Sequence, residues 1–278
     1  MASSLPAVPS HREPAPTSAG SRRTSGSRGI ALRLGGGAGG IWAVISLIGL
    51  LITRVVSPHG PPSWDARVID WLVAHRTPTL NAATAIGSGV ANTQTALAVT
   101  VVVVLLLRWR LGRWYESWVL VTAMAGELLV FVGITATVHR ARPAVQQLDG
   151  APPTSSFPSG HTAAAIALYG CVAILLLVLW PGVASRLAAC GLFAVPIVVG
   201  LSRLYRGMHY PSDVLFGAIG GALWLTVVMT TLLPGRPRTR TGTHAVRASA
   251  ARLRRASTAR AAGRGSVTDR HADVDGAS

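Results

Sequence analysis

The chain has 278 residues, half of them hydrophobic and only 13% charged, yet its formal net charge is +16. A soluble domain carries about 25% charged residues, which argues against an ordinary soluble globule, and the long apolar runs exclude disorder along the whole chain. Two cysteines, Cys171 and Cys190, are too few for a disulfide scaffold.

Two basic tails flank the apolar part of the chain. All 26 basic side chains are arginine, and residues 1–33 and 235–278 hold fifteen of them against four carboxylates, which is +11 of the net charge. Both tails are rich in Ser, Thr, Pro, Gly and Ala without an apolar period, so we expect them to be disordered. A basic arm for anionic lipid or nucleic acid is the alternative. Because the charge is segregated from the hydrophobic body, nucleic acid is the weaker interpretation, and we expect none as a partner.

Residues 34–234 have the pattern of a membrane domain. A spanning helix needs about 20 apolar residues, and nearly uncharged stretches of this kind recur along the domain. They are residues 34–53, 85–107, 117–138, 161–180, 187–202 and 214–234. No convincing cleavage site follows the first stretch, so we interpret it as a span and not as a signal peptide. The sequence therefore predicts an all-α, polytopic membrane bundle of about six transmembrane helices.

A short amphipathic segment follows the first span. Its apolar side chains are spaced i, i+4, i+7 and i+8, and are Trp64, Val68, Trp71 and Leu72. Polar side chains such as Asp65 fall largely on the other side, as in a helix that lies at a membrane interface. A plain surface connector is the alternative.

The distribution of arginine predicts the orientation in a plasma membrane. With six spans, both tails share one side with loops 108–116 and 181–186, and this side holds nineteen arginines against seven on the other. The arginine-rich side is expected to be cytoplasmic. The loops after the first, third and fifth spans then face outward.

Three polar clusters lie in the second and third outward loops. They are residues 139–143 (HRARP), 156–161 (SFPSGH) and 202–213 (SRLYRGMHYPSD). The clusters are far apart in the sequence, but the predicted topology places all three on one face of the membrane.

The side chains of these clusters suit a phosphoryl group. Arginine donates two parallel hydrogen bonds to phosphate and keeps its charge, so Arg142 and Arg203 are candidate clamps. Ser159 is a good N-cap residue, and Gly160 lets the backbone approach closely. Both precede a predicted helix, whose N-terminal N–H groups favour an anion.

Two histidines and a carboxylate complete the candidate site. His161 lies in the first turn of that predicted helix. Pro211 suits the first position of the sixth span, which places His209 just before the span and Asp213 in its first turn. We expect Asp213 to accept a hydrogen bond from one nitrogen of His209, which leaves the other nitrogen free to attack.

The clusters resemble the signature of the type 2 phosphatidic acid phosphatase family, also called the lipid phosphate phosphatases and related to the vanadium haloperoxidases. That signature reads K-x6-R-P, then P-S-G-H, then S-R-x5-H-x3-D. Residues 158–161 and 202–213 match the second and third parts in full. The first part matches only at Arg142 and Pro143, because Thr135 stands at the lysine position.

The resemblance implies a lipid phosphate or pyrophosphate phosphatase that needs neither a metal nor a cofactor. His209 would attack phosphorus to form a phosphohistidine, Asp213 would orient it, and His161 would protonate the leaving oxygen. The groups that would hold the phosphoryl oxygens are Arg142, Arg203, Ser159 and the Gly160 amide.

Thr135 removes one cation from that expected site. A hydroxyl donates one hydrogen bond without a charge, and losing a single such donor costs on the order of 10²–10³ in rate. His139 and Arg140 lie close enough in sequence to substitute. Our hypothesis is that Arg140 binds the phosphate together with Thr135.

Several alternatives stay open at this point. An outward site suits a polyprenyl pyrophosphate, and phosphatidic acid or phosphatidylglycerol phosphate fits the signature equally well. A lipid-linked phosphotransferase would use the same histidine with an alcohol acceptor, and Thr135 is also consistent with an inactive membrane binding protein. Glu127 lies mid-membrane, where a carboxyl is either protonated and bonded to a neighbouring helix or lines a polar cavity. The oligomeric state is open.

Overall fold

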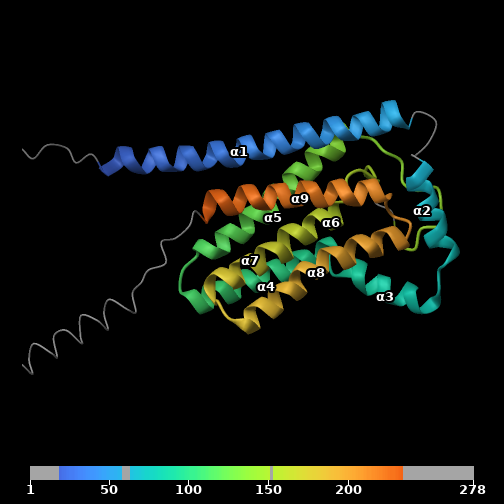
Figure 1. Ribbon diagram of the computed structural model, residues 1–278. Coiled ribbons are helices and arrows are strands. Elements are labelled where there is room, and N and C mark those ends of the chain that lie inside the picture. The colour runs from blue at the N-terminus through green and yellow to red at the C-terminus, as the bar shows by residue number, and fades with distance from the viewer. Residues whose placement is uncertain (1–18, 58–62, 151–152, 234–278) are drawn as a thin grey trace, which may run out of the picture. The chain divides into compact units, whose positions relative to one another are not determined.

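The structure is a computed structural model that describes residues 19–57, 63–150 and 153–233 (Figure 1). Every regular element in these ranges is a helix. Six helical segments are long and apolar enough to cross a membrane, which confirms the expected polytopic bundle. They are α1 (Ala19–Leu51) with the π-helical η1 (Ile52–Val56), α4 (Thr93–Leu111), α5 (Tyr115–Thr137), the continuous run of α6 (Gly160–Ala165), η2 (Ile166–Gly170) and α7 (Cys171–Leu179), α8 (Val183–Tyr205) and α9 (Pro211–Leu232). The shorter helices α2 (Ser63–Ala74) and α3 (Pro78–Gly89) come between α1 and α4.

The second span begins later than the hydropathy pattern indicated. A break at residues 90–92 separates α3 from α4, so the residues just after Ala85 belong to α3. The Oδ1 atom of Asn92 accepts a hydrogen bond from the N–H of Thr95 at 2.8 Å. This N-cap starts a new helix inside a stretch that is uncharged throughout.

Helix α1 begins at Ala19, inside the segment that was expected to be a disordered tail. Residues 19–33 extend a helix that the first span already forms, and adding a residue to a helix costs far less free energy than starting one. The other tail residues, 1–18 and 234–278, lie outside the described residues. Disorder there stays a prediction.

Helix α2 has the expected amphipathic character, and the structure shows which side faces the protein. Trp64 and Trp71 are exposed, whereas Asp65 and Ile69 are fully buried. The helix contacts α8 and α9. The side that carries Asp65 and Ile69 therefore packs against the protein, and the two tryptophans point away from it. Exposed tryptophans on one side suit a position at the membrane interface.

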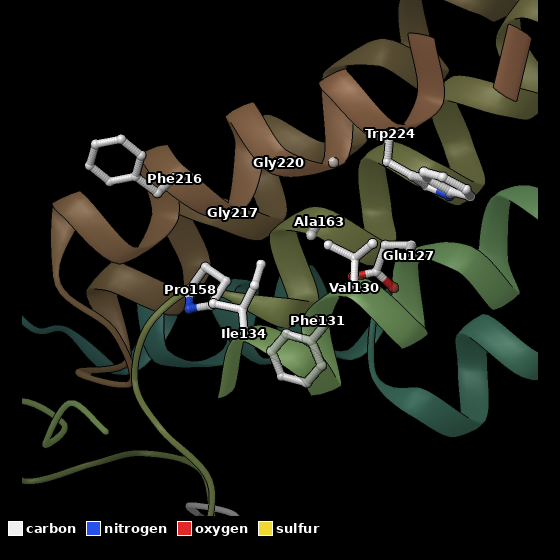
Figure 2. Close-up of a pocket in the computed structure, with 11 residues that line it drawn as sticks. Glu127, Val130, Phe131, Ile134, Pro158, Ala163, Phe216, Gly217, Gly220 and Trp224 are labelled. Atoms are coloured by element: carbon white, nitrogen blue, oxygen red, sulfur yellow. The ribbon is translucent and has the colours of Figure 1, made fainter. Parts of the chain in front are cut away.

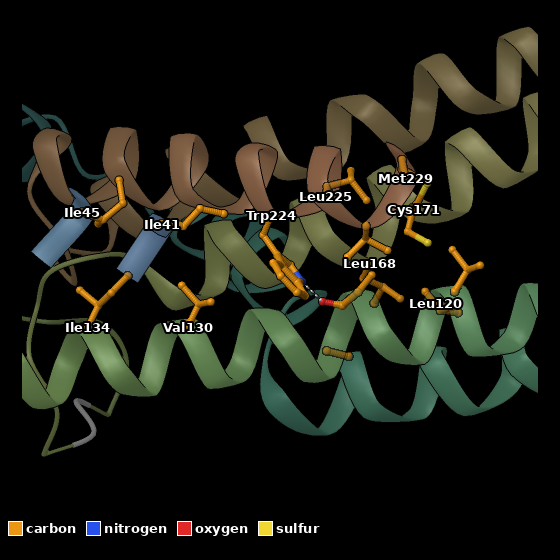
Figure 3. Close-up of a cluster of buried hydrophobic side chains, with 14 of the residues drawn as sticks. Ile41, Ile45, Leu120, Val130, Ile134, Leu168, Cys171, Trp224, Leu225 and Met229 are labelled. Carbon is orange, nitrogen blue, oxygen red and sulfur yellow. Dashed lines mark hydrogen bonds between the residues drawn. The ribbon is translucent and has the colours of Figure 1, made fainter. Parts of the chain in front are cut away.

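Helix α9 packs against α1, α5, α6 and α8. Buried apolar side chains fill the space between these helices, among them Ile45, Leu120 and Leu168 (Figure 3). The indole of Trp224 joins α9 to α5, because its Nε1 donates to the carbonyl of Ala123 at 2.8 Å. The one polar atom of this buried ring is thereby satisfied.

Two glycines allow close approaches to α9. A Cβ atom at Gly217 would lie 2.5 Å from the carbonyl oxygen of Ser159, and one at Gly126 would overlap the ring of Trp224. Only a residue without a side chain permits such approaches. Gly217 thus sets the start of α9 directly against the segment that leads into α6.

We expect Gly126→Ala to lower the melting temperature of the detergent-purified protein, because the added methyl group displaces Trp224 from between α5 and α9. Overpacking of a core costs about 1–3 kcal/mol. Gly191→Ala in α8 is the matched control, since nothing lies within 4 Å of the added Cβ atom and the gain in helix propensity is the same. Equal melting temperatures for the two variants would contradict the tight contact at Gly126.

Candidate active site

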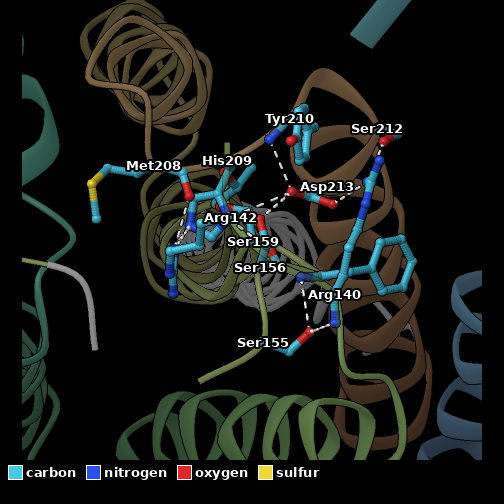
Figure 4. A network of polar contacts seen from close by, with 12 residues as sticks. Arg140, Arg142, Ser155, Ser156, Ser159, Met208, His209, Tyr210, Ser212 and Asp213 are labelled. Atoms are coloured by element: carbon cyan, nitrogen blue, oxygen red, sulfur yellow. Dashed lines mark hydrogen bonds and ion pairs between the residues drawn. The ribbon is translucent and has the colours of Figure 1, made fainter. Parts of the chain in front are cut away.

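Three segments that are distant in the sequence meet where α5 and α8 end and α6 and α9 begin (Figure 4). The N–H of Ser156 donates to the carbonyl of Arg140 at 2.8 Å, and the N–H of Ser159 donates to the carbonyl of Asp213 at 2.9 Å. The structure therefore brings the three expected polar clusters together.

The imidazole of His209 is buried at the centre of this region and is only 3% exposed. Its Nδ1 lies 2.8 Å from the carbonyl oxygen of Ser156. A carbonyl can only accept, so Nδ1 carries the proton and Nε2 of the neutral ring carries the lone pair. Burial, followed by the charges of Arg203 and Arg142, lowers the pKa of His209 well below 6.5, although the Ser156 carbonyl opposes the shift. The ring is thus uncharged at neutral pH, and its Nε2 lies 3.5 Å from Nη1 of Arg142.

The expected direct hydrogen bond between His209 and Asp213 is not made. The Oδ2 atom of Asp213 lies 3.9 Å from Nδ1 of His209. It accepts instead from the hydroxyl of Ser156 at 2.5 Å and from the N–H of Tyr210 at 2.9 Å. The carboxylate therefore reaches the imidazole through Ser156, whose hydroxyl binds Asp213 and whose carbonyl binds His209.

Arg140 does not occupy the position that we expected for a phosphate ligand. Its Nη1 lies 2.5 Å from Oδ1 of Asp213 and 2.7 Å from the hydroxyl of Ser212. Its Nη2 lies 2.8 Å from Oδ2 of Asp65, and its guanidinium covers the ring of Tyr210. Both terminal nitrogens are thus bonded to buried protein groups. The hypothesis that Arg140 replaces the missing lysine is therefore not supported by this geometry.

Thr135 has no contact with the region around His209 either. Its hydroxyl donates to the carbonyls of Phe131 and Val132 in its own helix, both at 3.1 Å. This local bonding is common for threonine inside a helix. His139, the other candidate substitute, has an exposed side chain. The structure thus shows the hydroxyl of Thr135 bonded within its own helix and the guanidinium of Arg140 bonded to carboxylates.

Arg142 lies beside the lone pair of His209. Its Nη1 donates to the carbonyl of Met208 at 2.8 Å, and its Nη2 lies 3.4 Å from the hydroxyl of Thr154. Its Nε is buried and has no hydrogen-bond partner among the described residues. The guanidinium therefore retains donor capacity for an anion.

Arg203 is held by a carboxylate that the sequence motifs did not reveal. The Nη1 atom of Arg203 donates to Oδ2 of Asp149 and to the hydroxyl of Ser88, both at 2.9 Å. The other oxygen of Asp149 lies 2.6 Å from Nη2 of Arg206. Burial opposes ionisation of Asp149, but its bond to Arg206 and the charges of Arg206 and Arg203 outweigh burial and lower its pKa.

One feature of the sequence could have drawn attention to Asp149. It is the single carboxylate between Glu127 and Asp213. The carboxylate of Asp149 is already bound by Arg203 and Arg206. An external oxyanion can therefore reach Nη1 of Arg203 only by displacing Asp149.

The second cluster begins α6 as the sequence predicted. Ser159 occupies the N-cap position, and Gly160 is the first helical residue. The hydroxyl of Ser159 shares a hydrogen bond with that of Thr162 at 3.0 Å. The ring of His161 is partly exposed and lies within electrostatic range of Arg142, Arg203 and Asp149.

Glu127 lies in a different environment from either of the two that we considered. It lines a cavity with apolar side chains that include Val130, Phe131 and Trp224, and the cavity reaches Pro158 (Figure 2). Its Oε1 has no hydrogen-bond partner among the described residues. The cavity is apolar, not polar, and the indole N–H that could have met the carboxyl bonds a backbone carbonyl.

The side chains that line the site are mostly histidines and arginines, so they present nitrogen atoms and positive charge. In the ranges that the structure describes, no group of three or more His, Cys, Asp or Glu side chains is arranged to hold a metal ion. The arrangement combines an uncharged buried imidazole, two arginines beside it and an indirectly linked carboxylate. The fold and this arrangement define a class of protein: a multi-pass helical membrane protein whose charged and polar side chains gather where the spans end.

Comparisons with known proteins agree with this class. Residues 116–235 match the model of the PAP2 superfamily. The match spans all three polar clusters. A comparison with curated proteins found no match.

Two solved structures are similar to this chain. One is the first transmembrane PAP2 type phosphatidylglycerolphosphate phosphatase from Bacillus subtilis, with a TM-score of 0.63 and 21% identity over 73% of this chain and 98% of that chain. The other is Aquifex aeolicus LpxE, with a TM-score of 0.47 and 20% identity over 60% of this chain and 93% of that chain. The first likeness shows a shared fold.

We expect Asp149→Asn to tighten the binding of inorganic phosphate by about tenfold, which corresponds to about 1.4 kcal/mol. The substitution removes a negative charge that competes for Arg203 and Arg206. Isothermal titration of the purified protein with phosphate measures the effect. Asp70→Asn is the control, because it removes the same charge from an exposed position on α2. Weaker phosphate binding in Asp149→Asn would mean that Asp149 positions the arginines for the anion instead of competing with it.

Proposed function

We propose that the chain is an integral-membrane phosphatase that removes phosphate from a lipid phosphate or pyrophosphate through a phosphohistidine at His209. The observation that carries the proposal is the state of this imidazole. The Ser156 carbonyl binds the Nδ1 hydrogen, so the lone pair lies on Nε2 beside Arg142. The PAP2 match over residues 116–235 and the six membrane-length helices support the same activity.

The first step of the proposed reaction transfers the phosphoryl group to the protein. The Nε2 lone pair of His209 attacks phosphorus, and the bond between phosphorus and the lipid oxygen breaks. His161 donates a proton to that leaving oxygen. In the second step, water attacks phosphorus, His161 takes up a proton from it, the P–N bond breaks and inorganic phosphate leaves.

Charge in the transition state is balanced by groups of this chain. Arg142 and Arg203 hold the phosphoryl oxygens, with Ser159 and the Gly160 amide as further donors. Asp213 acts through Ser156, which keeps the proton of His209 on Nδ1. We propose that two fixed arginines suffice and that no metal ion takes part, so a chelator leaves the rate unchanged.

The substrate is proposed from the position of the site. A lipid phosphate keeps its hydrocarbon chain in the membrane and presents its phosphate at the surface, where the span ends carry Arg142 and His209. Polyprenyl pyrophosphate, phosphatidic acid and phosphatidylglycerol phosphate all fit this description. The shared fold with a phosphatidylglycerolphosphate phosphatase supports including the last of these.

Two other functions would make different use of the same site. A phosphotransferase would form the same phosphohistidine and pass it to an alcohol, and product analysis separates a phosphorylated alcohol from free phosphate. An inactive binding protein is favoured by Thr135, since Arg140 is committed to carboxylates. Turnover by the wild-type protein excludes it.

The test of the proposed function is phosphate release by purified protein from the three lipids, with a chelator present. We expect His209→Ala to lower the rate by about 10⁴-fold or more, as when a nucleophile is removed from other hydrolases. His75→Ala, at an exposed histidine directly after α2, is the control and should keep the wild-type rate. Release that survives in His209→Ala would rule out the phosphohistidine, and loss of activity with chelator would rule out a metal-free site.

We also propose that the site faces the outside of a plasma membrane with both tails in the cytoplasm, which the arginine asymmetry supports. Cys171 is buried, so a Cys190→Ser background leaves no exposed thiol among the described residues. In intact cells, a membrane-impermeant maleimide should label Ala144→Cys, in the loop after α5. It should label Val183→Cys, at the opposite end of the spans, only after the cells are opened. The reverse pattern would overturn this orientation.

A further inference from the structure

Asp65 is a buried carboxylate that belongs to none of the three motifs. Its side chain lies in the first turn of α2 and is 0% exposed. A carboxylate is almost never fully buried unless it is paired, because removing its charge from water is costly. Its burial therefore points to a partner inside the protein.

The oxygens of Asp65 are satisfied by groups next to the candidate nucleophile. Oδ1 accepts from the N–H of Ser212 at 3.0 Å. Oδ2 accepts from Nη2 of Arg140 at 2.8 Å and from the hydroxyl of Ser212 at 2.5 Å. Ser212 adjoins Asp213 at the start of α9, so α2 is joined to the first turn of that helix.

From Arg140 the contacts continue to His209. Nη1 of Arg140 lies 2.5 Å from Oδ1 of Asp213, and Oδ2 of Asp213 accepts from the hydroxyl of Ser156 at 2.5 Å. The carbonyl of Ser156 accepts from Nδ1 of His209 at 2.8 Å. Asp65 is thus the far end of a buried chain of hydrogen bonds that ends on the ring of His209. Figure 4 shows the part of this chain from Arg140 to His209.

The charges along this chain give Asp65 a second effect. Arg140 and Asp213 alone form a neutral pair, which does little to stabilise a cation nearby. With Asp65, two carboxylates share one guanidinium, and the buried cluster carries a net charge of −1. When Nε2 bonds to phosphorus the imidazole becomes positive, and a fixed negative cluster favours that state over the neutral ring.

We propose that Asp65 is a positioning residue for the reaction at His209, acting through Arg140, Asp213 and Ser156. This role rests on the proposed phosphatase function. Because the hydrogen bonds of Asp65 are with Arg140 and Ser212 and not with Arg142 or Arg203, it raises the rate of phosphoryl transfer and leaves substrate binding unchanged.

The test is steady-state kinetics of Asp65→Asn, which keeps the size of the side chain and removes its charge. We expect kcat to fall by about 10- to 100-fold, the range seen when outer partners of an active-site imidazole are removed. We expect KM to stay within about twofold, because Arg142 and Arg203 are untouched. Asp70→Asn, on the exposed side of the same helix, should match the wild type.

A second measurement separates positioning from a purely structural role. The melting temperature and the affinity for inorganic phosphate should stay at their wild-type values in Asp65→Asn. If either is lost together with activity, Asp65 serves folding and the proposal is overturned. In an Asp213→Asn background, Asp65→Asn should lower kcat by less than about twofold, since the chain is already interrupted. A full effect in that background would also overturn the proposal.

The outcomes distinguish this proposal from the proposed function. A wild-type protein that releases no phosphate from any of the three lipids overturns both. A wild-type protein that is active, together with an Asp65→Asn variant of unchanged kcat, overturns only the role of Asp65.

Discussion

The guanidinium of Arg140 binds two buried carboxylates at once, Asp65 from α2 and Asp213 from α9. Removing Arg140 would leave two buried carboxylates without their cation, which is strongly destabilising. The cluster therefore fixes α2 and the segment after α5 to the first turn of α9. Through the hydroxyl and carbonyl of Ser156, it also sets which nitrogen of His209 carries the proton. The geometry of the candidate site depends on this interaction more than on any contact with an external anion.

Much of the fold follows from the sequence because a bilayer imposes a length. Six apolar stretches predicted six membrane-length helices, and the ends of those helices carry the three motifs. The residues at which the helices begin did not follow in the same way, since the cap at Asn92 divides a stretch that carries no charge along its length. Residues 19–33 are helical for the related reason that a formed helix is easily extended.

The partners of long charged side chains could not be predicted in the same way. Periodicity places Asp65 on the polar side of α2, but it does not reveal that this side faces α9 and the guanidinium of Arg140. Asp149 carries no motif, and its binding to Arg203 depends on a loop fold that brings distant segments together. The sequence predicted a direct hydrogen bond between His209 and Asp213, whereas the structure places Ser156 between the two side chains. The partners of Arg140 could not be predicted for the same reason, because its nearness in sequence to Thr135 does not reveal that its guanidinium binds two buried carboxylates.

The central claim is that the lone pair on Nε2 of His209 forms a bond to phosphorus. The most direct measurement is to quench the wild-type protein during turnover of a lipid labelled in its terminal phosphate and to locate the protein-bound label by mass spectrometry under alkaline conditions, which preserve phosphohistidine. The account predicts label on His209, and none in His209→Gln. Label on another residue, or phosphate release with no labelled protein at any quench time, would contradict it.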